Sequence, residues 1–225
     1  MIRNPKRLLG RGAFQSLLCI CVLFVVTFFP FNIAHAEQTV IDIWSEVKAP
    51  DPPELKPVKV DPKTTALMIL DIEKLTTNME RRPRAVASVP KIQELLIKAR
   101  NKGMFVVYST TGRGTPADIL PEVKPNEGEP VVKSSVDKFF NTDLEKYLVE
   151  KGIKSVIIVG TAAEGAVLHT ATGAAMRSLE VIVPVDGMSS STLYAEQYVC
   201  WHLVNAPGSR NKTTLTKIDM IEISD

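Results

Sequence analysis

The sequence predicts an α/β fold, in which a parallel sheet carries helices on both of its faces. Short apolar runs rich in β-branched residues alternate along the chain with segments whose apolar residues recur at helical spacing. Glycines follow two of the helical segments, at Gly103 and Gly152, as is typical of helix ends. Strands that alternate with crossover helices form parallel sheets, because each helix returns the chain to the same edge of the sheet.

The first half of the predicted domain contributes two strands and one helix. Thr65–Asp71 is an apolar run that ends in an acid, and Met104–Ser109 is a second apolar run. Between them, Ser88–Asn101 places its apolar residues on one helical face. Thr110–Glu129 is rich in Gly, Pro and charged residues, so we expect a loop over the sheet.

The second half repeats the alternation of strands and helices. Strands are expected at Val131–Lys133, Val156–Val159, Val181–Val185 and Thr213–Thr216, and helices at Thr142–Lys151, Glu164–Leu179 and Tyr194–Asn205. The sequence contains no internal repeat. The 189 residues that follow Ala36 suffice for one domain with a sizeable core.

The first 36 residues have the three parts of a secretory signal peptide. Four basic residues come first, Leu17–Phe29 forms an apolar core, and Ala34-His35-Ala36 is a small-residue cleavage site. We therefore predict a signal peptide at residues 1–36, a mature chain that starts at Glu37, and an exported protein that is periplasmic or secreted. An uncleaved N-terminal anchor is the alternative.

Residues 37–63 form a Pro-rich segment in front of the domain, which we expect at residues 64–225. Five prolines in this segment exclude a continuous helix and favour an extended path over the surface. The apolar residues between Ile41 and Val47 have two interpretations. They are either a small anchor against the body or a second subunit, or part of a disordered tail.

The charge of the chain argues against a nucleic-acid partner. The whole chain has 27 Lys and Arg against 25 Asp and Glu, but four of the basic residues belong to the leader. The mature chain therefore has 23 basic and 25 acidic residues, a formal net charge of −2. This balance favours neither nucleic acid nor an anionic membrane as a partner. No stable membrane anchor is expected after signal cleavage.

Cysteine usage excludes an intrachain disulfide in the mature chain. Cys19 and Cys21 leave with the leader, so Cys200 is the one mature cysteine. Its place in a predicted helix favours a buried, apolar role.

One stretch, Ser155–Leu179, combines a strand, a tight turn and a helix. The apolar run Val156–Val159 is followed by the small residues Gly160-Thr161-Ala162-Ala163, and helical spacing begins at Glu164. Such a turn leaves backbone N–H groups at the carboxyl end of a strand, where open parallel sheets bind ligands. The small residues allow a ligand to approach the backbone closely.

This stretch resembles the nucleophile turn of the isochorismatase-like hydrolases, or cysteine hydrolase superfamily, which includes nicotinamidases, N-carbamoylsarcosine amidase and isochorismatase. The residues in register with the family's pattern are Gly160, Ala162, Ala163, Val167, Thr170 and Ala171. Ala166 occupies the place of the nucleophilic cysteine. From about Thr64 to the C-terminus, the resemblance implies a three-layer α/β/α sandwich with a doubly wound, mainly parallel six-stranded sheet.

Two charged residues match the family's catalytic positions. Asp71 follows the first strand, where the family has its catalytic acid, although the usual Gln two residues later is Glu73. On the residues alone, a loop-capping role for Asp71 is an equal alternative. Lys133 lies in VVKSSVDKFFNTDL, which implies a catalytic or substrate-orienting lysine; a solvated lysine at a strand end is the alternative. A lysine beside Asp71 would lower the pKa of that carboxyl, while burial would raise it.

The missing cysteine changes the chemistry that the resemblance implies. Thiol members attack a carbonyl or nitrile carbon, which Ala166 cannot do. Isochorismatase has glycine at this place and cleaves a vinyl ether without a covalent intermediate. The N–H groups of Ala162 and Ala166 are implied to stabilise negative charge, next to a cis bond between Thr161 and Ala162. Thr161, Glu164 and Gly165 would face the substrate, although an acid that favours a helix N-terminus is the stronger interpretation of Glu164.

We expect no cofactor and no metal site. Nicotinamidases carry an Asp-x-His metal motif after the first strand, whereas this chain has no histidine between Asp71 and Pro90. His169 and His202 lie within predicted helices, where core or surface roles explain them better than metal binding. The run Glu80–Arg84 is expected to be a solvated loop, with an anion-recognising patch as the alternative.

The predicted function is hydrolysis of a small molecule, anionic or amide-bearing, without a cysteine nucleophile. Asp71 would be the acid–base group and Lys133 the orienting charge. A non-catalytic small-molecule-binding protein of the same fold is the alternative. A thiol amidase that uses Cys200 is disfavoured, because Cys200 lies a full strand–helix unit after the turn. Since the family commonly assembles, we also expect a homo-oligomer.

Overall fold

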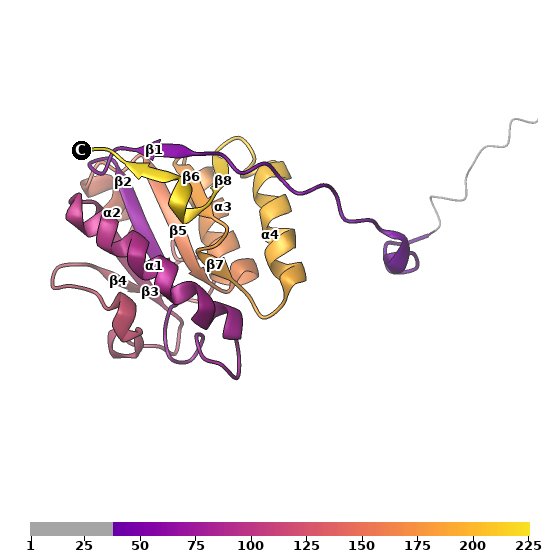
Figure 1. Cartoon of the computed structure of the whole chain (residues 1–225), viewed down its shortest axis with the longest axis horizontal. Helices are drawn as coiled ribbons and strands as arrows, with labels where there is room; N and C mark the ends of the chain where they lie inside the picture. The colour runs from indigo at the N-terminus through magenta and orange to yellow at the C-terminus, as the bar shows by residue number, and fades with distance from the viewer. Residues whose placement is uncertain (1–37) are drawn as a thin grey trace, which may run out of the picture. The chain divides into compact units, whose positions relative to one another are not determined.

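The structure is a computed structural model that describes residues 38–225. The predicted signal peptide, residues 1–36, lies outside this range. The chain divides into a first unit that ends at Pro50 and a second unit, Asp51–Asp225 (Figure 1). The described part of the first unit contains a 3₁₀ helix, Trp44–Glu46. Its exposed apolar side chains are Val40, Ile41, Trp44 and Val47.

The second unit is built on a sheet in which every paired strand is parallel. Its strands, in spatial order, are β4 (Val131–Lys133), β3 (Phe105–Thr110), β2 (Thr65–Leu70), β5 (Ser155–Thr161), β6 (Glu180–Pro184) and β8 (Thr213–Thr216). A short strand, β7 (Met188–Ser189), also pairs with β5 and makes the sheet seven-stranded. The α/β fold with a doubly wound parallel sheet is confirmed, and β7 is an addition to the six expected strands.

A small second sheet joins the two ends of the unit. Its strands are β1 (Val58–Val60) and β9 (Ile221–Ile223), which run parallel. The segment at residues 37–63 was expected to be extended, but this pairing was not predicted. It involves residues more than 160 positions apart, as shown by the hydrogen bond between Ser224 Oγ and the Val60 carbonyl at 2.7 Å.

Four α-helices connect the strands. They are α1 (Pro83–Asn101), α2 (Leu144–Glu150), α3 (Leu168–Met176) and α4 (Leu193–Asn205). α1 begins at Pro83, five residues before the expected start at Ser88. Proline is favourable in the first turn of a helix, because backbone N–H groups there have no hydrogen-bond partner within the helix. In residues 38–225, no helix has both the length and the apolar character needed to cross a membrane.

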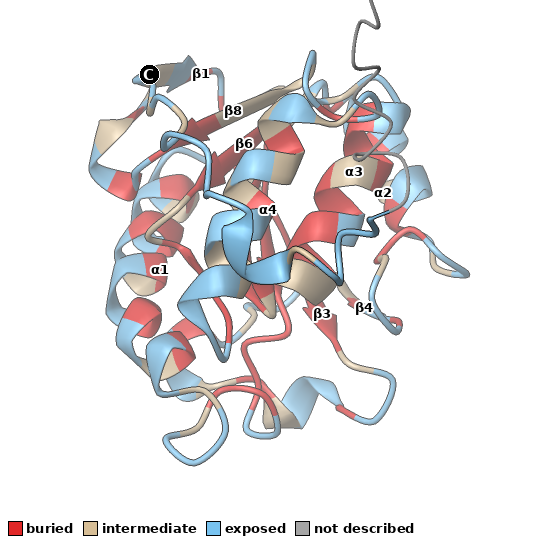
Figure 2. Cartoon of the chain, turned by 90° about the vertical axis from the view of Figure 1, so that its right-hand side faces the viewer, coloured by how far each residue is buried: buried red, intermediate tan, exposed pale blue. Residues whose placement is uncertain are grey.

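Helices cover both faces of the sheet (Figure 2). Leu67 and Ile69 of β2 pack on one face with α1 residues such as Ile92. Met68 and Leu70 of the same strand point to the other face, into the core that α2, α3 and α4 complete. All six residues of β2 are buried, as is typical of a central strand in a parallel sheet.

The sheet reverses its winding direction between β2 and β5. From β2 the chain continues to β3 on one side, and from β5 it continues to β6 on the other side. Open α/β sheets bind ligands just beyond the carboxyl ends of the strands at such a point. Leu70 is in register with both Ser109 of β3 and Gly160 of β5, so Asp71 and Thr161 emerge there side by side.

Candidate active site

Asp71 is the first residue beyond β2 and is buried at the carboxyl end of the sheet. Its backbone is in the left-handed region, with φ of 53°, which Asp adopts more readily than most residues. The carboxylate Oδ1 accepts a hydrogen bond from Ser109 Oγ at 2.7 Å. This bond ties Asp71 to the neighbouring strand β3 and holds the carboxylate in one orientation.

Lys138 provides the positive charge opposite Asp71. Its side chain is fully buried, and its Nζ donates to Asp71 Oδ2 at 2.8 Å. Nζ also donates to the carbonyls of Ser134 at 3.2 Å and Ser135 at 2.8 Å. An ammonium group has three protons, so these three acceptors use its donor capacity completely. The ammonium therefore holds Asp71 in place and has no proton left for a ligand.

The sequence predicts Lys133 as the orienting charge, whereas the structure pairs Asp71 with Lys138. Lys133 is the last residue of β4 and its side chain is exposed. The chain turns after β4, where Ser134 Oγ donates to the Asp137 carbonyl at 2.9 Å, and this turn carries Lys138 back over the sheet.

Burial has the largest effect on the pKa of the Asp71 carboxyl. Loss of solvent raises the pKa of this carboxyl, and the nearby Glu73 carboxylate also raises it. The Lys138 charge and the hydrogen bonds from Lys138 and Ser109 oppose the rise without cancelling it. The net pKa of Asp71 is therefore above its ordinary value, which suits a group that gives and takes a proton.

The turn after β5 has the unusual backbone that the resemblance implied. The peptide bond between Thr161 and Ala162 is cis, as expected. Gly160 has φ of 131°, and a Cβ there would lie 2.1 Å from the Leu70 carbonyl oxygen, so only glycine lets β5 approach β2 this closely. Thr161 Oγ1 donates to the Ser189 carbonyl at 3.0 Å and thereby fixes the turn to β7.

Ala166 lies in a π-helical turn, Ala163–Val167, which precedes α3. The sequence predicts an ordinary helix from Glu164 onward, so the π-helical turn is a difference that the structure reveals. Ala166 is 3% exposed, and Gly165 beside it is partly exposed. A Cβ on Gly165 would touch Val136 at 3.8 Å, so the segment that carries Lys138 also covers this turn. The turn and the Asp71–Lys138 pair thus belong to one site.

Glu164 is held at the edge of this site by a network from α4. Its Oε2 accepts a hydrogen bond from Ser190 Oγ at 2.5 Å. The N–H of Ser190 donates to Glu196 Oε1 at 2.9 Å, and Glu196 also accepts two hydrogen bonds from Arg84. The partly exposed Glu164 carboxylate is therefore positioned by its surroundings, beyond any favourable effect of a helix N-terminus.

Glu73 is a buried carboxylate that sequence reasoning did not place in the site. It is 0% exposed and accepts hydrogen bonds from Thr111 Oγ1 at 2.7 Å and from the Thr111 N–H at 3.3 Å. A Cβ on Gly114 would overlap Glu73 Oε2, which shows how tightly the loop encloses the carboxylate. Its position two residues after Asp71 was the available signal.

Among the histidines and the cysteine, His169 contacts the backbone of the turn, whereas His202 and Cys200 lie on α4. His169 is exposed on α3, with Nδ1 2.9 Å from the Gly165 carbonyl oxygen, and His202 contacts the Tyr198 hydroxyl at 3.2 Å. Residues 38–225 contain no group of three or more His, Cys, Asp or Glu side chains placed to hold a metal ion. Burial in α4 raises the pKa of Cys200 to about 11, so its thiol stays protonated at neutral pH.

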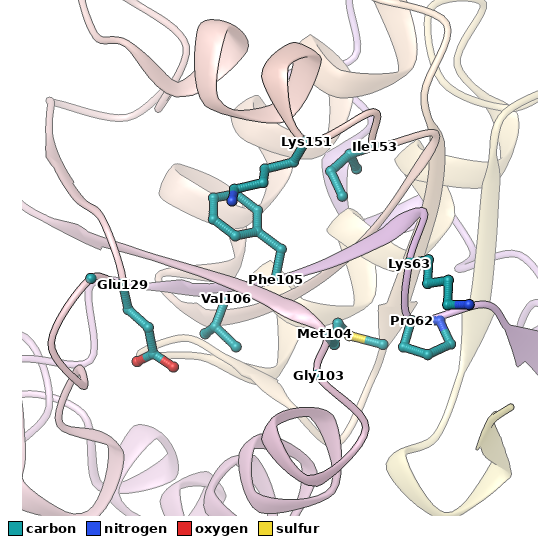
Figure 3. A pocket seen from close by; sticks show the side chains of 10 residues that line it. Pro62, Lys63, Gly103, Met104, Phe105, Val106, Glu129, Lys151 and Ile153 are labelled. Atoms are coloured by element: carbon teal, nitrogen blue, oxygen red, sulfur yellow. The ribbon is translucent and has the colours of Figure 1, made fainter. Parts of the chain in front are cut away.

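A pocket of about 270 Å³ lies at the other edge of the sheet (Figure 3). Phe105 at the start of β3, Pro62 before β2 and Ile153 before β5 contribute to its lining. Lys151 lies over the Phe105 ring, 5.6 Å from its centroid. Because this pocket is at the amino ends of the strands, it is separate from Asp71.

Comparisons of this chain with family models, curated sequences and solved structures all point to one family. The model of the Isochorismatase domain matches residues 65–213. The secreted isochorismatase effector Isc1 of Verticillium dahliae is 32% identical over 150 residues, which cover 62% of this chain and 72% of the effector. N-carbamoylsarcosine amidase of an Arthrobacter species is 26% identical over 56% of this chain and 58% of the amidase. The crystal structure of a cysteine hydrolase from Pseudomonas syringae superposes with a TM-score of 0.63 at 18% identity, over 74% of this chain and 94% of the hydrolase.

Proposed function

Because this chain belongs to the isochorismatase family, we propose that it hydrolyses a small molecule without a cysteine nucleophile, with Asp71 as the acid–base group. The observation that carries the proposal is the buried pair of Asp71 and Lys138 beside a turn whose nucleophile position is Ala166. A methyl group cannot form a covalent intermediate, so water must be the nucleophile.

The raised pKa of Asp71 supports an acid role. In the proposed reaction, the Asp71 carboxyl gives its proton to the leaving oxygen or nitrogen as the bond from that atom to carbon breaks. Water adds its hydroxyl to the same carbon, and the proton that water loses returns to Asp71. Lys138 is a positioning residue in this scheme, because its three protons are already bound.

The turn would stabilise negative charge that develops on the substrate. In this proposal the backbone N–H groups of Ala162 and Ala166 are the donors, and Thr161 and Gly165 line the substrate side. Glu164 is the further candidate for substrate binding, since it is partly exposed and held by Ser190. No cofactor or metal takes part in the proposed reaction.

We also propose that the protein is exported and forms a homo-oligomer. The predicted signal peptide at residues 1–36 supports export, and a relative with 32% identity is described as secreted. The exposed apolar side chains between Val40 and Val47 support self-association. N-terminal sequencing is expected to find Glu37, and light scattering is expected to find a dimer or larger. An intact Met1 on the exported protein, or a monomer at micromolar concentration, would contradict these two proposals.

The loss of the nucleophile also favours a second candidate function, a binding protein that has kept the site without its chemistry. Incubating the wild-type protein with a metabolite mixture and following it by mass spectrometry separates the two. A hydrolase depletes one component and releases products that together are heavier by one water. A binding protein retains a component through gel filtration without releasing products, and that result would overturn the hydrolase.

A further inference from the structure

An anionic substrate would need a cation in the site that is free to face it, and Lys138 is not free. Lys138 has given its three protons to Asp71 and two carbonyls. Lys133 is exposed at the end of β4, and the lysine that pairs with Asp71 is Lys138 instead. A further candidate cation is Arg82, which directly precedes α1 and lies two residues before Arg84, the partner of Glu196.

The backbone of Arg82 is held by hydrogen bonds, whereas its side chain has no hydrogen-bond partner among the described residues. Its N–H donates to the Asn78 carbonyl at 2.9 Å, and its carbonyl accepts from the Ala85 N–H at 2.9 Å. The side chain is half-buried, and its Nε atom is buried without a hydrogen-bond acceptor among the described residues. A buried donor without an acceptor is unfavourable, so this geometry is costly unless a ligand completes it.

The neighbouring arginines provide a contrast. Arg81 donates to the Leu75 carbonyl at 3.2 Å, and Arg84 makes a two-pronged contact with Glu196 at 2.8 and 2.5 Å. Arg82 makes no side-chain hydrogen bond and no ion pair with any residue between 38 and 225. Of the three, Arg82 is therefore the residue whose donors remain available.

Contacts of the same segment place Arg82 beside the proposed site. Arg84, two residues further along, pairs with Glu196, which also accepts a hydrogen bond from the Ser190 N–H, and Ser190 Oγ donates to Glu164. Burial and the charge of Arg81 lower the pKa of Arg82, whereas the carboxylates of Glu164 and Asp71 raise it. Among the described residues, the guanidinium makes no ion pair with Asp71 or Glu164. Glu164 accepts a hydrogen bond from Ser190, and Asp71 accepts one from Lys138. The guanidinium of Arg82 can therefore bind an acidic group of a ligand.

We propose that Arg82 binds a carboxylate of the substrate through its Nε–H and one Nη–H, so that the substrate is a small monocarboxylic acid. A guanidinium presents two parallel donors that match the two oxygens of a planar carboxylate. A phosphate dianion fits less well, because Asp71, Glu73 and Glu164 would repel its second charge. The inference rests on the proposed function for the position of the site, but it concerns binding and is measured without turnover.

The test follows the Nε–H resonance of Arg82 by NMR in the full mature protein. The resonance is assigned by its absence from Arg82→Gln. The probes are benzoate, crotonate and N-acetylglycine, each compared with its primary amide, and inorganic phosphate. We expect the acids to shift the resonance saturably and to bind at least about tenfold more tightly than the amides, as expected for hydrogen bonds to a charged group.

The variants separate recognition from folding. Arg82→Gln is expected to weaken binding of the acids about tenfold or more and to abolish their advantage over the amides, whereas Arg81→Gln changes binding less than about twofold. Arg82→Lys is expected to keep part of the preference, because it retains the charge but not the paired donors. The Arg84 Nε–H resonance reports whether each variant is folded.

Three results would overturn the inference: no acid shifts the Arg82 resonance, the amides bind as tightly as the acids, or phosphate binds more tightly than every carboxylate. If the acids bind at Arg82 but the wild-type protein turns over no substrate, the proposed hydrolysis is contradicted and the proposed carboxylate site is supported. If the wild-type protein turns over a substrate and Arg82→Gln does not change that turnover, the proposed carboxylate site is contradicted and the proposed hydrolysis is supported.

Discussion

Lys138 Nζ lies 2.8 Å from Asp71 Oδ2, although the two residues are 67 positions apart in the chain and both side chains are buried. A buried ion pair is stable only when the remaining polar atoms of both partners are satisfied. Here the two other protons of the ammonium go to backbone carbonyls, and Ser109 donates to the second oxygen of Asp71. The pair therefore holds the carboxyl end of β2 against the segment that follows β4.

Removal of the buried lysine is expected to destabilise the protein strongly. Lys138→Met leaves the Asp71 carboxylate buried without its counter-charge, which costs about 3–5 kcal/mol in the free energy of unfolding. Lys133→Met, at an exposed position five residues earlier, is expected to change it by less than about 0.5 kcal/mol. Urea denaturation of both variants measures the difference. Equal effects of the two substitutions would contradict the pairing.

The raised pKa of Asp71 predicts a specific pH dependence of stability. Between the ordinary value of 3.8 and the higher value in the folded protein, the folded state keeps a proton that the unfolded chain has released. The free energy of unfolding therefore falls as the pH rises through this window. Asp71→Asn cannot titrate and lacks this contribution. If denaturation at several pH values shows the wild type gaining stability relative to Asp71→Asn as the pH rises, the predicted direction is wrong.

Substitutions in the site are expected to affect turnover unequally. Asp71→Asn removes the acid–base group and should lower kcat/KM about 10²–10⁴-fold on the substrate found by the metabolite screen. Ala166→Gly should be mild, because only the backbone N–H of that residue is used. Steady-state kinetics with both folded variants provide the comparison. Full activity of Asp71→Asn would exclude the proposed mechanism.

The close approach of β5 and β2 makes Gly160 irreplaceable. A Cβ there would lie 2.1 Å from the Leu70 carbonyl oxygen, and φ of 131° is strained for any other residue. We expect Gly160→Ala to cost about 3 kcal/mol or more in stability. Gly112→Ala is the matched control, since nothing lies within 4 Å of a Cβ at Gly112. Thermal denaturation should show a large loss only for Gly160→Ala, and a tolerated Gly160→Ala would contradict the observed strand contact.

Cys200 is expected to react slowly and without consequence for activity. With a pKa of about 11 instead of the ordinary 9.0, it carries roughly a hundredfold less thiolate at pH 8 than an unperturbed cysteine. Mass spectrometry after iodoacetamide treatment of the native protein measures the rate, with free glutathione as the reference thiol. Rapid labelling that stops turnover in a protein that remains folded would restore the thiol mechanism.

The sequence by itself determined six strands of the main sheet, their order along the chain and two residues of the candidate site. The short apolar runs at Thr65–Leu70 and Val156–Val159 suit strands that are buried on both faces, and both strands are confirmed. Asp71 follows from the end of the first run. Ala166 follows from its register within the turn of small residues.

The tertiary structure alone decided which side chains meet. Lys133 matched the motif, but the turn after β4 exposes Lys133 and buries Lys138, and no local pattern records where a loop returns to the sheet. The pairing of β1 with β9 and the available donors of Arg82 depend on contacts between distant segments. Local periodicity reports how each segment folds, whereas the distances between charged groups depend on how the segments pack.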